Sequence, residues 1–527
     1  MTRARFGLAI LLTLHVAHRT EGQQPAPDAR DRSDAAARAI ETEALMTDEE
    51  RFNLIISVMG GNPVIGLDRH ALIPAEVAMS AGYTPGVPRL GIPALQSSDA
   101  SMGVTNPGYR PDDPGATAFP ASILIGATFN PEIAREGGVR IGREARSRGF
   151  NIMLAGGINL ARDPRNGRNF EYYAEDPLAS AVMAAAAVNG IQSQNVISTL
   201  KHLSLNSNEV NRHWLDAIID PAAHRESDLL AFQIAIERSR PGSIMTSYNK
   251  INGTYATGNE HLLQEVLKGE WGYPGWVMSD WGATPDWRFA LAGLDQESGM
   301  QGDVIQWGAE AFTDSLRAAY AAGAFPRERL SEMVQRILYS VYAVGVDRWG
   351  PAPAVDMAEH GQVALEAARQ GIVLLKNDGI LPLAAERPLK VAVIGGWAQV
   401  GVPTGTGSGA VLPVGGFGAT LPIGGPGGRV AGARNLYLLP TSPLEELKKL
   451  LPDAQIEFDP GYTPAEAALL ARRSDVVIAF GIRVEGEGFD LPDLSLPWGQ
   501  DAVIAAVAAT NPNTVVNRPE FAGGSNP

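Results

Sequence analysis

The stretch Gly275-Trp-Val-Met-Ser-Asp-Trp-Gly282 carries the strongest local signal in the chain. Its apolar run at 276–278 follows a glycine and precedes a serine, which is typical of a short buried strand. Such a strand would deliver Asp280 to its C-terminal end, with the flat ring of Trp281 beside it. Taken alone, the stretch also fits a helix N-cap at Asp280 and a core position for Trp281.

Similar apolar runs alternate with helical patterns on both sides of this stretch. Asn130-Pro131 and Asp220-Pro221 each have the pattern of an N-cap residue followed by a proline in the first helical turn. The sequence predicts strands at 93–96, 122–127, 151–154, 196–200, 243–246 and 276–278, and helices at 131–148, 221–238 and 327–346. Repeated strand-then-helix units predict an α/β fold, a (β/α)8 TIM-type barrel over residues 41–346.

A second α/β domain is predicted beyond Trp349-Gly-Pro-Ala-Pro, where the pattern breaks, so residues 347–359 are expected to form a linker. Helices at 360–370 and 499–509, with strands at 371–376, 390–396, 475–481 and near 515, predict an α/β sandwich with a mostly parallel sheet over residues 360–516. The Gly- and Pro-rich segment 404–429 is either a flexible surface linker or a loop that reaches from this domain towards the barrel mouth.

The composition excludes several classes of function. Of 527 residues, 45% are hydrophobic and 19% are charged, and the formal net charge is −15. That charge argues against a nucleic-acid partner, because phosphates require clustered Lys and Arg. The chain has no cysteine, which rules out disulfides, thiolate metal sites and cysteine nucleophiles. The sequence shows no His and acidic cluster with ligand spacing, so we expect neither a metal nor another cofactor.

The N-terminus has the layout of a secretory signal peptide. Arg3 and Arg5 precede an apolar run at 6–17 that is too short to span a membrane, and a polar stretch follows. We therefore expect a signal peptide at residues 1–22, a disordered linker at 23–40 and a secreted or periplasmic protein. A disordered or amphipathic leader is the alternative. The sequence contains no other stretch that is apolar enough for a membrane-spanning helix.

Two further clusters gather polar side chains in predicted strand-end regions. One is Lys201-His-Leu-Ser-Leu-Asn-Ser-Asn-Glu-Val-Asn-Arg212, which offers hydrogen-bond donors to a cleft. The other, Arg168-Asn-Phe-Glu-Tyr-Tyr-Ala-Glu-Asp-Pro177, combines charges, aromatic rings and turn-forming residues. Strand ends form the active-site face of a barrel, and Asp99, Lys201, His202, Tyr248 and Asp280 all follow apolar runs. Structural ion pairs would explain both clusters equally well from the sequence alone.

In their order and spacing these segments resemble glycoside hydrolase family 3, the β-glucosidase and β-xylosidase family. The resemblance spans about residues 40–510 and includes Met245-Thr-Ser-Tyr-Asn249 and Gly371-Ile-Val-Leu-Leu-Lys-Asn-Asp-Gly-Ile-Leu-Pro382. It implies hydrolysis of a terminal β-linked glucose with retention, through a covalent glycosyl-enzyme formed on Asp280. It also implies a pocket for the non-reducing-end sugar, formed by Asp99, Arg168, Lys201, His202, Arg212, Tyr248 and the ring of Trp281.

The resemblance places the general acid/base in the second domain. Arg483-Val-Glu-Gly-Glu-Gly-Phe-Asp490 resembles the family's loop, with Glu487 at the acid/base position and Glu485 as the runner-up. A loop that closes over the sugar would exclude water and keep such an acid protonated. Ser408, in the Gly-rich segment, is expected to reach the same pocket.

Three departures from the family pattern accompany the resemblance. Around Asp99 the chain reads Ser-Asp-Ala-Ser-Met, where many members have Asp-Gly-Pro, and Leu491 stands where many members have Arg. Beyond residue 516 the pattern dissolves, so we expect a C-terminally incomplete sandwich and an atypical tail at 517–527.

The implied substrates are β-linked oligosaccharides or aryl and alkyl β-glycosides, and the sequence does not indicate an oligomeric state. A β-xylosidase or another exo-β-glycosidase is the first alternative, because pentose and hexose pockets differ by one hydroxymethyl group. A β-N-acetylglucosaminidase of the same family is disfavoured, because those members carry an Asp-x-His acid/base where this chain reads Ser-Leu-Asn-Ser-Asn-Glu209. A catalytically impaired carbohydrate-binding relic is the alternative from another class.

Overall fold

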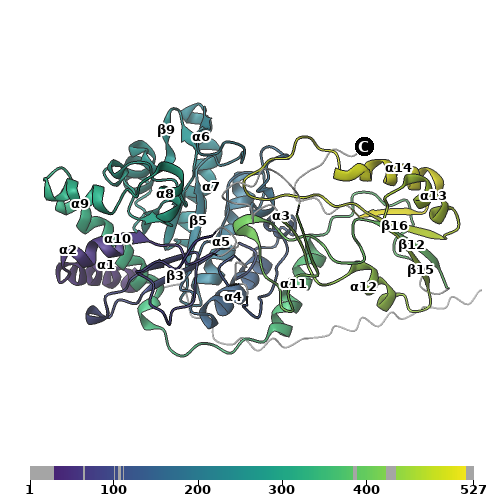
Figure 1. Cartoon of the computed structure of the whole chain (residues 1–527), viewed down its shortest axis with the longest axis horizontal. Coiled ribbons are helices and arrows are strands. Elements are labelled where there is room, and N and C mark those ends of the chain that lie inside the picture. The colour runs from purple at the N-terminus through teal and green to yellow at the C-terminus, as the bar shows by residue number, and fades with distance from the viewer. Residues whose placement is uncertain are drawn as a thin grey trace, which may run out of the picture.

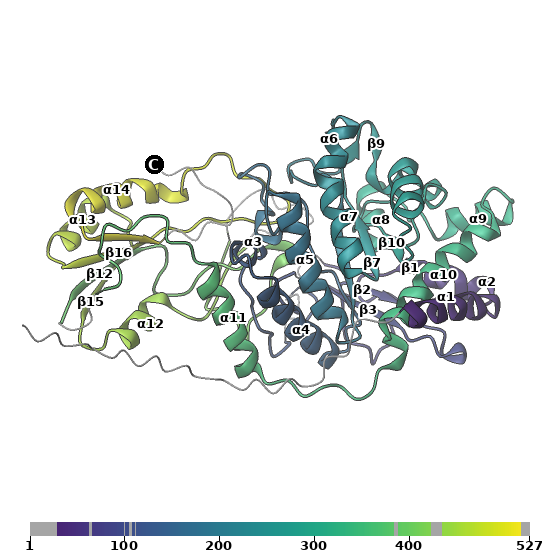
Figure 2. The same cartoon turned by 180° about the vertical axis from the view of Figure 1, so that it is seen from behind.

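The computed structural model describes residues 29–62, 66–99, 101–104, 108–110, 112–383, 388–422 and 435–517 of the chain. The predicted signal peptide at 1–22 and residues 518–527 of the predicted tail lie outside the described residues. The described chain forms two lobes that lie side by side, as both faces of the molecule show (Figures 1 and 2). Within these ranges, no helix combines the length and the apolar character that crossing a bilayer requires.

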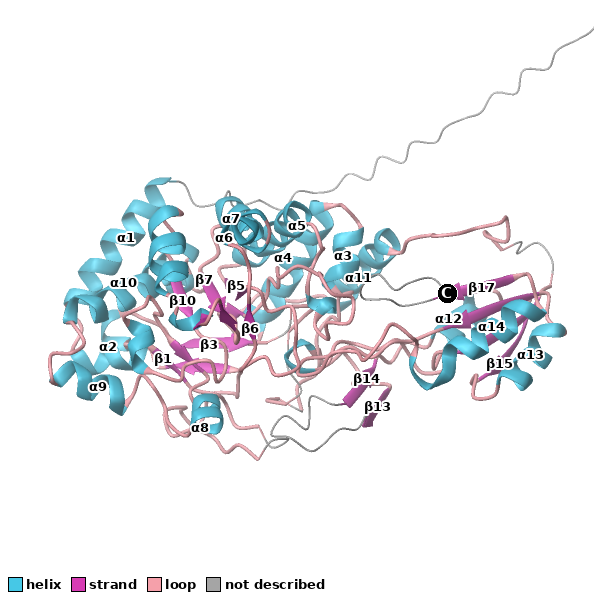
Figure 3. Cartoon of the chain, turned by 90° about the horizontal axis from the view of Figure 1, so that it is seen from above, coloured by secondary structure: helices cyan, strands magenta, loops and turns pink. Residues whose placement is uncertain are grey.

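The first lobe is organised around a curled sheet (Figure 3). Its largest part has the strand order β10-β7-β5-β4-β3-β2, in which only β2 runs antiparallel to its neighbour. A second pair, β1 and β11, is parallel, and single bridges join it to the larger sheet at Val58–Tyr83 and Met278–Gln296. The strands are β1 (Ile56–Ser57), β2 (Gly82–Thr84), β3 (Leu95–Ser98), β4 (Ile152–Met153), β5 (Ile197–Leu203), β7 (Ser243–Thr246), β10 (Trp276–Met278) and β11 (Glu297–Ser298).

This sheet confirms the barrel prediction only in part. Adjacent strands β3, β4, β5, β7 and β10 are parallel, as a strand-then-helix repeat requires. The antiparallel β2 contradicts a ring of eight parallel strands, because that ring would need a crossover helix between β2 and β3. The lobe therefore has a curled, mostly parallel sheet whose C-terminal strand ends share one edge.

Helices cover the outside of this sheet. Asn130 and Asp176 cap the helices that follow them, each accepting a backbone N–H bond, and a proline occupies the first helical turn in both cases. The covering helices are α1 (Ala29–Ala44), α2 (Asp48–Leu54), α4 (Pro131–Ser147), α5 (Pro177–Gln192), α6 (Pro221–Glu226), α7 (Asp228–Ser239), α8 (Gln301–Trp307), α9 (Asp314–Ala321) and α10 (Arg327–Val344). Small elements at the same lobe are β6 (Asp216–Ala217), β8 (Lys250–Ile251), β9 (Thr254–Tyr255) and a π-helix (His261–Glu270).

Three sequence predictions for this lobe are wrong. Residues 122–127 form helix α3 (Ser122–Ala127) instead of the predicted strand. The prediction failed because the periodicity of a six-residue apolar run does not distinguish a buried strand from a buried helix. The helix expected at 221–238 is divided at Ser227 into α6 and α7. The disordered linker expected at 23–40 is wrong for residues 29–40, which belong to α1, where Ala35 and Ala39 are buried four residues apart on one face.

Helix α11 (Met357–Gly371) packs on the first lobe rather than on the second, in contact with α3 and α4. Its His360 lies with Nδ1 2.7 Å from Oε1 of Glu144, and both side chains are buried. The domain boundary predicted at 360 is therefore wrong. The strand predicted at 371–376 does not form either, and the side chains from Ile372 to Leu375 are at least 60% exposed.

The second lobe contains an all-parallel sheet with the order β15-β12-β16-β17, as the predicted sandwich requires. Alternate residues of one strand face opposite layers: Ala392 and Ile394 pack towards α13 and α14, whereas Val391 and Val393 pack towards α12. The elements are β12 (Lys390–Gly395), β15 (Gln455–Asp459), β16 (Val476–Phe480), β17 (Thr514–Asn517), α12 (Pro443–Leu450), α13 (Pro464–Arg472) and α14 (Gln500–Thr510). An antiparallel pair, β13 (Ala419–Pro422) and β14 (Asn435–Leu438), completes the lobe.

Candidate active site

Three adjacent parallel strands bring their C-terminal ends together. β5 pairs with β7 at Leu200–Ile244, and β7 pairs with β10 at Met245–Met278. Since the C-terminal ends of parallel strands lie at one edge, side chains that follow them converge. Lys201, His202, Tyr248 and Asp280 meet at this edge, as the contacts below show.

Asp280 is held through one carboxylate oxygen. Its Oδ1 accepts hydrogen bonds from the Tyr248 hydroxyl at 2.7 Å and from the Trp281 backbone N–H at 2.8 Å. Among the described residues, Oδ2 has no hydrogen-bond partner, and the nearest basic atom is Nε2 of His202 at 3.5 Å. Asp280 is buried, at 6% exposure, and the two bonds at Oδ1 fix the orientation of the carboxylate and of its second oxygen.

A buried ion-pair cluster lies beside it. Arg168 forms a two-pronged contact with Glu171, from Nε to Oε1 at 2.9 Å and from Nη2 to Oε2 at 3.0 Å. The Lys201 ammonium lies 3.5 Å from the same Oε2. All three side chains are at most 3% exposed, and such a fork geometry fixes the direction of a guanidinium group.

Arg212 connects the first lobe to the second. Its Nη1 lies 2.8 Å from Oε1 of Glu487, and its Cζ lies 4.0 Å from the centroid of the Tyr248 ring. Since Tyr248 in turn donates to Asp280, these contacts form a continuous path between the two candidate catalytic carboxyl groups.

Glu487 comes from the second lobe and enters this cluster. Its Oε2 accepts a hydrogen bond from the backbone N–H of Ser408 at 2.8 Å, and its Oε1 also lies 3.7 Å from Nη1 of Arg168. The turn at Gly407 is required for this contact, because its φ is +71° and a Cβ atom there would lie 2.5 Å from Cβ of Glu487. The Gly-rich segment therefore reaches the mouth of the first lobe, and Ala116 pairs with Pro413 there as well.

The charges around the cluster set the protonation of its members. Burial raises the pKa of Asp280, and the charges of Arg168 and Arg212 oppose that rise. For Glu487 the same two guanidinium groups outweigh the effect of burial and hold its pKa well below 4.5. Burial, with the charges of Arg168 and Lys201, lowers the pKa of His202 well below 6.5, so His202 is neutral.

The remaining predicted residues lie at the edges of this cluster. Burial raises the pKa of Asp99 to about 7, against the opposing charge of Lys201. Trp281 donates from Nε1 to the Ala81 carbonyl at 3.0 Å, which fixes its ring. The Ser408 hydroxyl accepts from Nη2 of Arg168 at 3.4 Å. Glu485, the runner-up acid, is buried beside Arg483 within the second lobe, with Oε1 4.0 Å from Nε.

Sequence reasoning missed two members of the cluster. Glu171 is the partner of Arg168 and Lys201, and Glu209 is the partner of Arg212, with 2.8 Å between Oε2 and Nη1. In both cases the acid and an arginine are three residues apart, a spacing that brings side chains together on a helical turn. That spacing was visible in the sequence and could have identified them.

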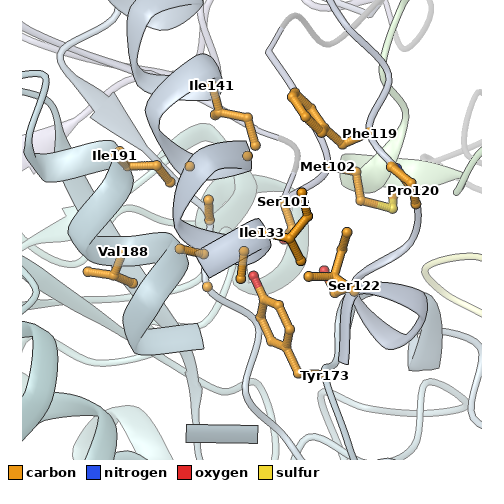
Figure 4. A pocket seen from close by; sticks show the side chains of 17 residues that line it. Ser101, Met102, Phe119, Pro120, Ser122, Ile133, Ile141, Tyr173, Val188 and Ile191 are labelled. Carbon is orange, nitrogen blue, oxygen red and sulfur yellow. The ribbon is translucent and has the colours of Figure 1, made fainter. Parts of the chain in front are cut away.

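A separate cavity lies against helices α4 and α5 (Figure 4). Ile133 and Ile141 of α4, Val188 and Ile191 of α5 and Phe119 contribute apolar side chains to its lining. Its volume is about 30 Å³. Ligand pockets measure roughly 300–1,000 Å³, so this cavity is a packing void rather than a sugar site.

Comparison with known proteins assigns a family to both lobes. The model of the glycosyl hydrolase family 3 N-terminal domain matches residues 81–341, and the model of the family 3 C-terminal domain matches residues 372–518. A β-glucosidase of Rhizobium radiobacter is 37% identical over 332 residues, covering 62% of this chain and 40% of that protein. An exo-α-(1→6)-L-arabinopyranosidase of Bifidobacterium longum is 34% identical over 471 residues, covering 83% of this chain and 57% of that protein.

The arrangement of the two lobes also matches solved structures. β-Glucosidase 3B of Thermotoga neapolitana, solved with glycerol, superposes with a TM-score of 0.78 at 30% identity, covering 91% of this chain and 68% of that one. The chain spans about half the length of the curated relatives quoted above. On the two family models and this shared architecture, the chain belongs to glycosyl hydrolase family 3.

Proposed function

We propose that this protein hydrolyses terminal, non-reducing β-D-glucosyl residues with retention of configuration. Asp280 is the nucleophile and Glu487 is the general acid/base. The observation that carries the proposal is the state of Asp280, whose Oδ1 is fixed by two donors while Oδ2 has no hydrogen-bond partner among the described residues. A nucleophilic carboxylate needs one oriented oxygen of this kind.

The reaction would proceed in two displacements. In the first, Oδ2 of Asp280 attacks the anomeric carbon while Glu487 protonates the leaving glycosidic oxygen. In the second, Glu487 as a carboxylate takes a proton from water, the water oxygen attacks the anomeric carbon, and Asp280 is released. Asp99, Arg168, Lys201, His202, Arg212, Tyr248, Trp281 and Ser408 would hold and orient the sugar.

In the protein without a bound sugar, the protonation state of Glu487 suits the second displacement better than the first. Glu487 is ionised there because Arg168 and Arg212 hold its pKa well below 4.5. Sugar hydroxyl groups that engage these guanidinium groups would weaken their contacts with Glu487 and let the carboxyl group take up a proton. Substrate binding would thereby prepare the acid.

The test is trapping of the covalent intermediate. A 2-deoxy-2-fluoro-β-glucoside with a good leaving group should inactivate the enzyme and label the peptide that contains Asp280, as read by mass spectrometry. Proton NMR should show β-glucose as the first product. Inversion, or a label on another peptide, would contradict the assignment, and a complete lack of turnover would favour the non-catalytic relic.

The role of Glu487 is tested separately. Glu487→Gln should slow hydrolysis of β-glucosides with poor leaving groups by about 10²–10⁴-fold, the usual range for general acid catalysis, and should affect dinitrophenyl glucosides much less. Equal losses on both substrates would count against Glu487.

A pentopyranoside is the second candidate substrate. One matching relative is named as an arabinopyranosidase, and β-xylosidase activity is expected as an alternative on the resemblance alone. A β-D-xylopyranose lacks only the hydroxymethyl group of β-D-glucose, whose pocket contributes roughly 1–3 kcal/mol of discrimination, whereas an α-L-arabinopyranose also differs from glucose in its configuration at C4. Ratios of kcat/KM for 4-nitrophenyl β-glucoside, β-xyloside and α-L-arabinopyranoside decide between them.

We further propose that the chain is exported, through the signal peptide expected at residues 1–22, and that the first-lobe sheet closes into a barrel that includes the antiparallel strand β2. The layout of residues 3–17 supports export, and the bridges that join β1 and β11 to the larger sheet support closure. N-terminal sequencing of the protein recovered from outside the cytoplasm tests export.

A further inference from the structure

The carboxylate of Asp490 joins the second lobe to two loops of the first. Its Oδ1 accepts hydrogen bonds from the backbone N–H groups of Gly167 and Glu209, both at 3.0 Å. Its Oδ2 accepts from Glu209 at 3.0 Å and from Val210 at 2.9 Å. Hydrogen bonds to an ionised acceptor are roughly twice as strong as neutral ones, so this single side chain makes a strong contact between lobes.

A carboxylate of the first lobe, that of Glu209, also accepts a hydrogen bond from the second lobe. Oε2 of Glu209 accepts a hydrogen bond from the backbone N–H of Gly488 at 2.8 Å, and the same atom lies 2.8 Å from Nη1 of Arg212. Nη1 of Arg212 in turn lies 2.8 Å from Glu487. One segment of the first lobe, residues 209–212, therefore holds both the backbone and the carboxylate of the loop that carries Glu487. We call the reciprocal contacts of Asp490 and Glu209 the clasp.

The two loops also fit closely in shape. A Cβ atom at Gly167 would lie 1.8 Å from the carbonyl oxygen of Phe489 and 2.4 Å from that of Gly486. Just beyond the clasp, the Leu491 N–H donates to the Arg165 carbonyl at 2.8 Å. The turn at 486–491 thus lies directly on the loop that precedes Arg168.

We propose that Asp490 is a positioning residue that sets the place of Glu487 over the sugar pocket. The inference rests on the proposed role of Glu487 as the acid/base. Asp490 follows Glu487 by one short turn, and Glu487 itself is held by contacts with Ser408 and Arg212 that require the turn to stay on the first lobe. A general acid must lie within hydrogen-bond reach of the leaving oxygen, and a misplacement of about 1 Å can cost about 100-fold in rate.

The variant that tests the clasp is Asp490→Asn, with Asp493→Asn as its matched control. Asparagine keeps the size of the side chain but turns one acceptor into an amide that faces N–H donors. Asp493 is on the same loop, and its Oδ1 accepts from Ser495 within the second lobe. Aryl β-glucosides of graded leaving-group pKa should show, for Asp490→Asn, a loss of kcat/KM of about 10- to 100-fold with poor leaving groups and much less with good ones. Asp493→Asn should follow the wild type throughout.

Gly167→Ala changes the first-lobe side of the clasp. This variant serves as the test if Asp490→Asn does not fold. Its Cβ would push the turn away, so it should produce the same selective loss. A uniform loss across the leaving-group series, or no loss, would overturn the positioning role.

Hydrogen exchange gives a readout that does not depend on turnover. Backbone amides at 485–491 and at 208–210 should lose protection in Asp490→Asn and keep it in Asp493→Asn. Unchanged protection would overturn the clasp. If the wild type fails to hydrolyse the glucosides, the proposed function fails, whereas the exchange measurement still judges the clasp.

Discussion

The guanidinium group of Arg212 lies 2.8 Å from Glu487, and the same group covers the ring of Tyr248. Through Tyr248 it is one hydrogen bond away from Asp280. One positive charge therefore acts on both carboxyl groups: with Arg168 it opposes the rise that burial causes in the pKa of Asp280, and it holds the pKa of Glu487 well below its usual value.

Replacing Arg212 by Gln should move the whole pH profile of kcat/KM to higher pH. Burial favours the neutral form of both carboxyl groups, and loss of the opposing charge would raise the pKa of each. Since both pKa values should rise, both limbs of the profile should shift to higher pH, whichever carboxyl group each limb reports. The exposed Arg225, which pairs with Glu270, provides the control Arg225→Gln. Limbs that move apart would contradict the shared charge.

Tyr248→Phe should weaken the nucleophile without unfolding the protein. Burial raises the pKa of Asp280, and the Tyr248 hydrogen bond is one of the contacts that lower it. Its loss should move the limb of the kcat/KM profile that reports Asp280 to higher pH. A hydrogen bond to a charged group contributes about 1.5–3 kcal/mol, so kcat/KM at the optimum should fall by roughly 10- to 100-fold. Two unchanged limbs would show that the hydroxyl does not tune Asp280.

Gly407→Ala should impair acid catalysis, whereas Gly416→Ala should not. Both glycines have a positive φ, +71° and +83°, so alanine strains the backbone similarly at each. Only at position 407 would the new Cβ lie 2.5 Å from Cβ of Glu487, while nothing lies within 4 Å at position 416. Gly407→Ala should lose at least as much stability as Gly416→Ala in thermal unfolding, and kcat for poor leaving groups should fall only in Gly407→Ala. Equal kcat values would show that Glu487 tolerates displacement.

A buried carboxyl pair near Asp280 should make stability depend on pH. Burial raises the pKa of Glu297 to about 7, and burial with the neighbouring Glu297 raises that of Asp303 well above its usual value. Groups with raised folded-state pKa values favour folding at low pH, and this contribution is lost as pH rises through those values. The Tm should therefore fall between pH 5 and values above 7.

Asp303→Asn should flatten that dependence. The amide oxygen can still accept a hydrogen bond from the Thr284 N–H. The amide N–H can donate to Glu297 at every pH, whereas the Asp303 carboxyl group can do so only when it is protonated. Thermal unfolding of both proteins across this pH range is the measurement. An equally steep slope in the variant would mean that other groups cause it.

The sequence predicted those parts of the molecule that depend on local pattern. The strands at 243–246 and 276–278 have the predicted bounds, because turn-forming residues delimit these apolar runs on both sides. The candidate residues around Asp280 and Glu487 were identified from motifs, and the structure brings them into one cluster.

Other parts depend on tertiary contacts that no local pattern records. Residues 122–127 and 371–376 are short apolar runs, and the first became a helix while the second formed no strand. The ion pair between Lys201 and Glu171 and the clasp at Asp490 join segments far apart in the sequence. Only the folded chain reveals such partners.

The packing of α11 on the first lobe matters for any attempt to produce that lobe alone. His360 lies against Glu144 of the first lobe, and Gly371 passes so close to Leu124 that a Cβ there would lie 2.2 Å away. A fragment cut at residue 346 would strip away this helix and leave the Glu144 carboxylate without its buried imidazole, which is costly in an apolar setting. The natural cutting point comes after Gly371.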